Sequence, residues 1–109
     1  MTQTITTTNP ATAQPIETYE TMVPEEVVTI TEHADQAFRR WREMPVEKRL
    51  PSLQRAAALL RERRDRYARL ITLEMGKPIT EARAEVEKCA FLCDVYAEKG
   101  PEWLREEEV

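Results

Sequence analysis

Hydrophobic residues recur every three or four positions along most of this 109-residue chain, the spacing of one face of an α-helix. The first such stripe begins after Pro24 and ends before Pro45, and proline suits the first position of a helix. Its members are Val27, Ile30, Ala34, Phe38 and Trp41. The pattern therefore predicts a helix between the two prolines.

A second helical pattern runs from about Val46 to Met75 and changes phase on the way. Its first stripe, if continued, would bury Arg64, and the apolar register resumes only at Tyr67. A phase shift of this kind at Glu62–Arg64 predicts either two helices or one bent helix.

The last helical pattern extends from about Thr80 to Lys99. Its apolar positions step by four, three, four and three, which predicts one buried stripe. The members of this stripe are Ala82, Val86, Cys89, Cys93 and Tyr96. Gly100-Pro101 follows, and we expect this pair to end the helix.

Residues 1–23 differ from the rest of the chain because they are rich in threonine and proline. Thr4–Thr8 and Ile16–Tyr19 favour β-strands, and the turn residues Asn9–Pro15 lie between them. A two-strand hairpin is marginal in water by itself, so it should lie against another part of the protein. The sequence thus predicts a mainly α fold with a short N-terminal β-hairpin, divided into residues 1–23 and a helical segment, 24–109.

Gly76 separates the last two helical patterns and is one of only two glycines. A residue in the left-handed conformation at a helix end is usually glycine, and Pro78 prevents continuation. Gly76-Lys77 also suggests a phosphate-binding loop. That loop needs an earlier glycine, where Ile71 stands, and a serine or threonine after the lysine, where Pro78 stands. We therefore interpret Gly76 as a helix stop and expect Lys77 to be solvated.

Composition and charge narrow the function classes. A third of the residues are charged and the formal net charge is −4, which argues against nucleic-acid binding. No apolar run approaches the ~20 residues that span a bilayer, so we expect no membrane association. The first residues lack the basic and apolar regions of a signal peptide, so we expect a cytoplasmic protein.

Few side chains suggest chemistry. Cys89 and Cys93 share a helix face, and we expect two buried thiols, since a metal site would need more ligands. Glu81, Glu85 and Lys88 lie on one side of the last helix, where helical pairing explains them better than a catalytic carboxylate pair. The arginine-rich run Arg61–Arg69 is interrupted by acids and is expected to form a solvated or inter-domain face. From residue types alone the chain contains no recognisable active site.

Several stretches nevertheless resemble a known family. TTTNPATAQPI is similar to the opening hairpin of the NAD(P)-dependent aldehyde dehydrogenase superfamily, and LITLEMGKPITEARAEVEKC resembles its early helices. KCAFLCDVYAEKGPEWL is most similar to the succinate-semialdehyde dehydrogenase branch. Two residues depart from the family pattern: Pro51 stands where relatives usually have a helix former, and Ala13 stands where Asn-Pro-Ala-Thr is usually followed by glycine. The turn must therefore avoid a positive φ or accept strain.

The resemblance implies an oxidoreductase several times longer, with a Rossmann-like cofactor domain, a catalytic domain and an oligomerisation arm. This chain would be the N-terminal fragment of that α/β fold, with the cofactor domain incomplete and the catalytic domain absent. The catalytic and cofactor-binding groups all lie later in the family, so the chain alone is expected to be inactive and to bind neither NAD nor NADP. Its partners would be the remainder of the dehydrogenase chain and, in the complete enzyme, further copies of itself.

Two structural roles follow from the resemblance by position. Thr7, Thr8 and Glu74 match positions that hold a structural monovalent cation in some relatives. Glu85, Lys88 and Cys89 match positions at the wall of the substrate tunnel. A different hypothesis remains open beside the dehydrogenase, namely a stand-alone helical interaction module derived from such an enzyme.

Overall fold

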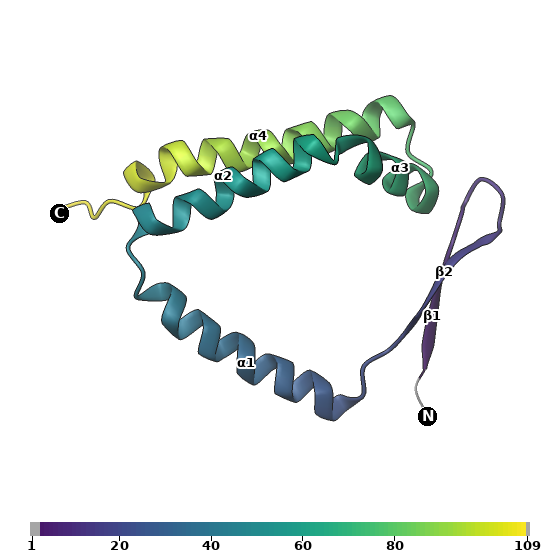
Figure 1. Cartoon of the computed structure of the whole chain (residues 1–109), viewed down its shortest axis with the longest axis horizontal. Coiled ribbons are helices and arrows are strands. Elements are labelled where there is room, and N and C mark those ends of the chain that lie inside the picture. The colour runs from purple at the N-terminus through teal and green to yellow at the C-terminus, as the bar shows by residue number, and fades with distance from the viewer. Residues whose placement is uncertain (1–2, 109) are drawn as a thin grey trace. The chain divides into compact units, whose positions relative to one another are not determined.

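The computed structural model describes residues 3–108, which form a hairpin followed by four helices (Figure 1). The elements are β1 (Thr4–Thr8), β2 (Pro15–Glu20), α1 (Pro24–Arg42), α2 (Val46–Glu62), α3 (Arg64–Met75) and α4 (Ile79–Trp103). The predicted mainly helical fold with an N-terminal hairpin is confirmed. The chain divides into two compact units, one containing the hairpin, α1 and Leu73–Gly76, the other containing Pro45–Thr72 and the chain from Lys77 onward.

The hairpin is antiparallel, with Thr6 opposite Thr18 and an irregularity in register between Thr7 and Thr8. Its turn is held by Asn9, whose backbone N–H donates to the Gln14 carbonyl at 2.9 Å and whose Oδ1 accepts from the Ala11 N–H at 2.9 Å. Ala13 completes the turn with φ +58°. We expected this turn either to avoid a positive φ or to accept strain, and Ala13 accepts the strain.

Helix α1 begins as its sequence predicts. Pro24 occupies the first turn, and the Glu26 carboxylate accepts a hydrogen bond from the Val23 N–H at 3.1 Å. Glu25 and Glu26 also place negative charge at the positive end of the helix dipole. None of the residues of α1 is buried, so its apolar stripe lies at the surface.

The phase shift near Glu62 marks a true break between two helices. Arg63 has φ −103° and ψ 15°, which lies outside helical geometry, and α3 begins at the next residue.

Helix α2 runs side by side with α4 (Figure 1). Small side chains form the buried core: Ala57, Ala68, Ala82, Val86, Ala90 and Ala97. Larger side chains that are only partly buried pack against Ala68, Ala82 and Val86 of this core: Leu60, Tyr67, Ile71 and Ile79.

The stripe predicted on α4 is confirmed at Ala82 and Val86, and from Cys89 onward it is wrong by about one position. The buried residues of this helix are Ala82, Val86, Ala90, Ala97 and Gly100. Cys89 is exposed, Cys93 is only partly buried, and Tyr96 is exposed, so the expectation of two buried thiols is also wrong. Neighbouring residues on a helix point about 100° apart, so a shift of one position moves the buried face from the cysteines to the alanines.

The end predicted for α4 is wrong as well, because Gly100 and Pro101 lie inside the helix. Proline normally excludes the residue before it from the helical region, since its ring clashes with the Cβ of that residue. Gly100 has no Cβ, so this clash is reduced. The helix then continues to Trp103, and the Leu104 N–H donates to the Gly100 carbonyl at 2.9 Å.

Gly76 follows α3 with φ +71°, as the helix-stop interpretation requires. A Cβ at this position would lie 3.1 Å from Cγ of Pro10, which stands in the hairpin turn. Glycine is thus required twice, by the left-handed backbone and by the close approach of the hairpin. This contact is one point at which the hairpin turn meets the chain after α3.

Candidate functional site

One open hollow of about 560 Å³ lies along the first turns of α4. It is lined by Lys77, Glu81, Ala84, Glu85, Lys88, Cys89 and Leu92. Three of these residues, Glu85, Lys88 and Cys89, are those that the family resemblance assigns to the wall of the substrate tunnel. The structure brings these three together, because on a helix residues three and four apart share one side.

Lys77 joins this hollow although we expected it to be solvated. Its Nζ donates a hydrogen bond to Oε2 of Glu85. This hydrogen bond raises the pKa of Lys77 above its ordinary value, and the charges of Glu85 and Glu81 act in the same direction. Glu85 therefore pairs with a residue before the helix, rather than through the i,i+3 helical pairing expected with Lys88. The hollow is lined by two lysines and two glutamates, so its charges balance.

The three candidate cation ligands lie in the same compact unit. Thr7 and Thr8 stand at the register irregularity of β1, and Glu74 is a half-buried residue in the last turn of α3. Thr8 pairs with Pro15, which has no N–H, so that residue cannot donate to the Thr8 carbonyl. Among the ion pairs of residues 3–108, none includes Glu74. Carbonyl and carboxylate oxygens are the ligands that hard cations prefer, so the donor set fits such an ion.

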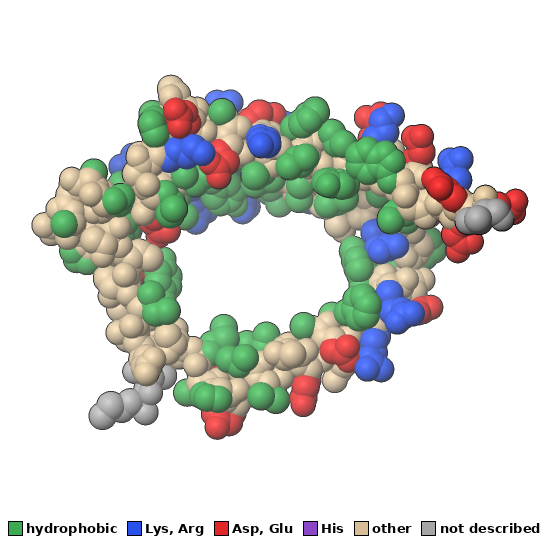
Figure 2. Space-filling view, turned by 180° about the vertical axis from the view of Figure 1, so that it is seen from behind, with side chains coloured by type: hydrophobic (Ala, Val, Ile, Leu, Met, Phe, Trp, Pro, Cys, Tyr) green, Lys and Arg blue, Asp and Glu red, His purple; other side chains and the backbone are tan. Residues whose placement is uncertain are grey.

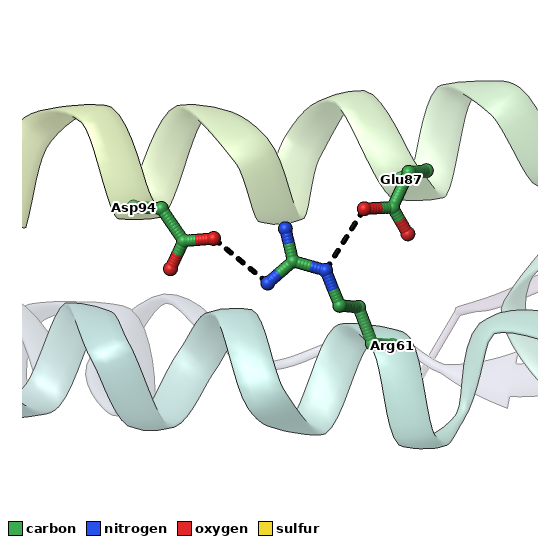
Figure 3. Close-up of polar contacts among 3 residues, drawn as sticks. All are labelled: Arg61, Glu87 and Asp94. Carbon is green, nitrogen blue, oxygen red and sulfur yellow. Dashed lines mark hydrogen bonds and ion pairs between the residues drawn. The ribbon is translucent and has the colours of Figure 1, made fainter.

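Helix α4 is fixed against α2 by one arginine (Figure 3). Arg61 Nε lies 2.8 Å from Glu87 Oε1, and Arg61 Nη1 lies 2.7 Å from Asp94 Oδ2. Hydrogen bonds to Glu87 and then Asp94 raise the pKa of the Arg61 guanidinium above its ordinary value. Glu87 and Asp94 are seven residues apart, so the one arginine contacts α4 at two points about two turns apart.

A second ion pair connects α3 to α4. Arg83 Nε lies 2.9 Å from Asp65 Oδ1, and this hydrogen bond lowers the pKa of the Asp65 carboxyl. Arg61 and Asp65 both belong to the arginine-rich run, which we expected to be a solvated or inter-domain face. Part of that run instead pairs with α4, although these side chains remain partly exposed.

Large apolar side chains reach the surface of the helices (Figure 2). The exposed fractions on α1 are 57% for Phe38 and 44% for Trp41, and those on α4 are 58% for Phe91, 42% for Leu92 and 57% for Trp103. Tyr96 and Trp103 contact each other edge to face, with ring centroids 5.7 Å apart. Large apolar side chains that gather into a surface patch usually contact other protein or a ligand.

Between residues 3 and 108, no three His, Cys, Asp or Glu side chains gather as metal ligands. No helix of the described chain combines the length and apolar character that crossing a bilayer requires.

Comparison with known proteins identifies the family. The family model for the aldehyde dehydrogenase family matches residues 1–109. A probable succinate-semialdehyde dehydrogenase [NADP(+)] of Synechocystis sp. is 44% identical over 105 residues, covering 96% of this chain and 23% of that protein. The succinate-semialdehyde dehydrogenase [NADP(+)] of Deinococcus radiodurans is 43% identical over 98 residues, covering 90% of this chain and 20% of that protein.

A solved structure agrees with the sequence matches. The succinic semialdehyde dehydrogenase of Streptococcus pyogenes, crystallised with NADP+, superposes with a TM-score of 0.86 at 36% identity. The match covers 92% of this chain and 22% of that one, so the chain spans between a fifth and a quarter of the length of these relatives. The resemblance seen in TTTNPATAQPI and LITLEMGKPITEARAEVEKC is confirmed, and so is the likeness to the succinate-semialdehyde branch. The chain belongs to the aldehyde dehydrogenase family.

Proposed function

We propose that this chain forms the N-terminal part of an NAD(P)-dependent aldehyde dehydrogenase that oxidises succinate semialdehyde to the carboxylic acid. The observation that carries the proposal is the identity of 44% and 43% with two succinate-semialdehyde dehydrogenases over at least 90% of the chain. When bound, NAD(P)+ accepts the hydride of the aldehyde. The residues of this chain would hold and cover the parts of the enzyme that perform this step.

The exposed apolar faces support a covering role. Helices that lie on a larger domain bury on it the apolar residues that they expose when alone. Phe38 and Trp41 on α1 and Phe91 and Leu92 on α4 are such residues. We therefore propose the remainder of the dehydrogenase chain as the partner of these faces, with residues 1–23 as the hairpin segment and 24–109 as the helical part of the cofactor-binding domain. The complete enzyme would associate into a homo-oligomer.

The hairpin and the end of α3 would hold a structural monovalent cation through the Thr7 and Thr8 carbonyls and the Glu74 carboxylate. The proline opposite Thr8 and the half-buried position of Glu74 support this site. Gly76 allows the hairpin turn to approach the end of α3 closely, and such an ion would strengthen this contact.

The hollow on α4 would form part of the substrate tunnel wall through Glu85, Lys88 and Cys89. Its balanced charge supports a wall rather than a strong anion site, because the Lys77–Glu85 pair already neutralises one residue of each sign. These residues would shape the tunnel, and the reacting groups would come from the remainder of the chain.

A chimera tests the proposal. The matching segment of the Deinococcus radiodurans relative is replaced by this chain, and oxidation of succinate semialdehyde with NADP+ is followed by absorbance of the reduced cofactor. We expect turnover above that of the same relative with the segment deleted. A chimera that melts as cooperatively as the relative but shows no turnover would contradict the proposal.

The exposed faces also suit the second hypothesis, a helical interaction module that binds a full-length relative. The nucleotide sequence downstream of Val109 separates the two. A continuing reading frame that encodes the rest of the family pattern supports the dehydrogenase, whereas a stop codon with separate expression of the chain supports the module.

A further inference from the structure

Two free thiols lie one turn apart on α4, and neither is among the buried residues of this helix. Cys89 is exposed and Cys93 is partly exposed. Residues four apart on a helix are neighbours, with Cβ atoms about 5–6 Å from each other. The buried residues of α4 are alanines, Val86 and Gly100, so neither cysteine belongs to its buried core.

Helix geometry keeps the two sulfurs from bonding to each other. All Cα–Cβ bonds of a helix tilt toward its N-terminus, so the two Cβ atoms remain apart and roughly parallel. A disulfide needs them about 3.5–4.5 Å apart, which would require the helix to open. An atom that bridges the two sulfurs can span the gap while the helix stays intact.

We propose that Cys89 and Cys93 form a dithiol site for soft, thiophilic electrophiles that take two sulfur ligands, represented by monosubstituted trivalent arsenicals. Thiolates prefer soft centres, and a centre that needs two protein ligands matches the two available here. Zinc would need about four ligands, which the described residues around this pair do not provide. Cys89 of this site also lines the hollow that is proposed above as part of the substrate tunnel wall.

The reaction with phenylarsine oxide is balanced without an oxidant. Two S–H bonds and the bonds between arsenic and oxygen break, two As–S bonds form, and one water molecule leaves with both thiol protons and the oxygen. Arsenic remains trivalent and neither sulfur is oxidised.

The reduced 109-residue chain is titrated with phenylarsine oxide, free thiols are counted with a chromogenic disulfide, and the mass of the denatured adduct is recorded. We expect one arsenical per monomer, loss of both thiols together, and helix content by circular dichroism that does not fall. Because both bonds must break for release, a monothiol should displace the arsenical about 10²- to 10⁴-fold less effectively than from a single-thiol variant, Cys89→Ser or Cys93→Ser.

A matched variant with both thiols exposed tests the geometry. Cys93→Ser combined with Phe91→Cys keeps two cysteines, but two positions apart, where helical side chains do not face each other. Phe91 is 58% exposed, so its replacement leaves the buried core unchanged. Equal retention of the arsenical by this variant, two arsenicals per parent chain, a cross-linked dimer, or loss of helix on binding would each overturn the proposal.

Discussion

Replacing Gly76 by alanine should destabilise the hairpin and the end of α3 together. Gly76 has φ +71°, and a residue with a Cβ pays roughly 1–2 kcal/mol to adopt the left-handed conformation. The added Cβ would also lie 3.1 Å from Pro10 Cγ, so the proline must move by a few tenths of an ångström. Alanine lowers the entropy of the unfolded chain, but that gain of about 0.4–1 kcal/mol applies only where the native φ suits it.

We therefore expect Gly76→Ala to lower the free energy of unfolding by about 1–2 kcal/mol. For a chain of this length a loss of 1 kcal/mol lowers the melting temperature by roughly 4–8 °C, which thermal circular dichroism resolves easily. Gly76→Asn should lose less than Gly76→Ala, since asparagine tolerates the left-handed region better. A melting temperature for Gly76→Ala equal to that of the parent would refute this reasoning.

The remaining predictions concern charge, strain and activity. Ala13→Gly should raise the free energy of unfolding by up to about 1 kcal/mol in a denaturant titration, because Ala13 has φ +58°. A lower free energy of unfolding would show that alanine is not strained in this turn. Lys77→Ala should change the melting temperature little, since its pair with Glu85 is partly exposed, and it should leave NADP+ affinity of the chimera unchanged; a large loss of affinity would restore a phosphate site. Because Arg83 lowers the folded-state pKa of Asp65, the pair stabilises the fold above the unfolded-state pKa, and this contribution is lost as the pH falls through the folded-state pKa. Asp65→Asn should therefore lower the melting temperature at neutral pH but not in strong acid, and an equal difference at both would contradict the pairing. The chain alone, incubated with NAD+ or NADP+ and succinate semialdehyde, should produce no reduced cofactor, and steady protein-dependent turnover would disprove this.

Local signals predicted much of the fold. An interruption between α2 and α3, as a break or a bend, is predictable because continuing the apolar stripe would bury Arg64. Gly76 is predictable as a helix stop because Pro78 follows it and because Ile71 and Pro78 do not fit a phosphate-binding loop. These features depend on residues close together in the sequence, where helix periodicity and turn chemistry act directly.

The burial of α4 could not be derived in the same way. Hydrophobic patterns give most weight to large side chains, so Cys89, Cys93 and Tyr96 outweighed the alanines that form the buried face. Which face is buried depends on how closely α2 approaches, and small residues permit the closest approach. Glycine followed by proline is the usual sequence signal of a helix end, so Gly100-Pro101 predicts a stop. The same glycine lacks a Cβ, which reduces the clash with proline and lets the helix continue.

The polar contacts were also invisible in the sequence. Arg61 meets Glu87 from 26 residues away, and Lys77 meets Glu85 across the turn into α4. Neither spacing is a helical repeat within one element. The grouping of Glu85, Lys88 and Cys89 was predictable because all three share one helix. Lys77 precedes that helix, so its place beside Glu85 depends on the path of the loop, which the sequence does not reveal.

The alanine core also determines how the chain responds to heat. The heat capacity of unfolding rises with the apolar area that becomes exposed, and Ala57, Ala68, Ala82, Ala90 and Ala97 each release little. A small enthalpy and a small heat capacity change flatten the stability curve and widen the thermal transition. Calorimetry of the chain should show a shallow, broad peak, and the same helices should unfold more sharply once Phe91, Leu92 and Trp103 are covered by the rest of a dehydrogenase.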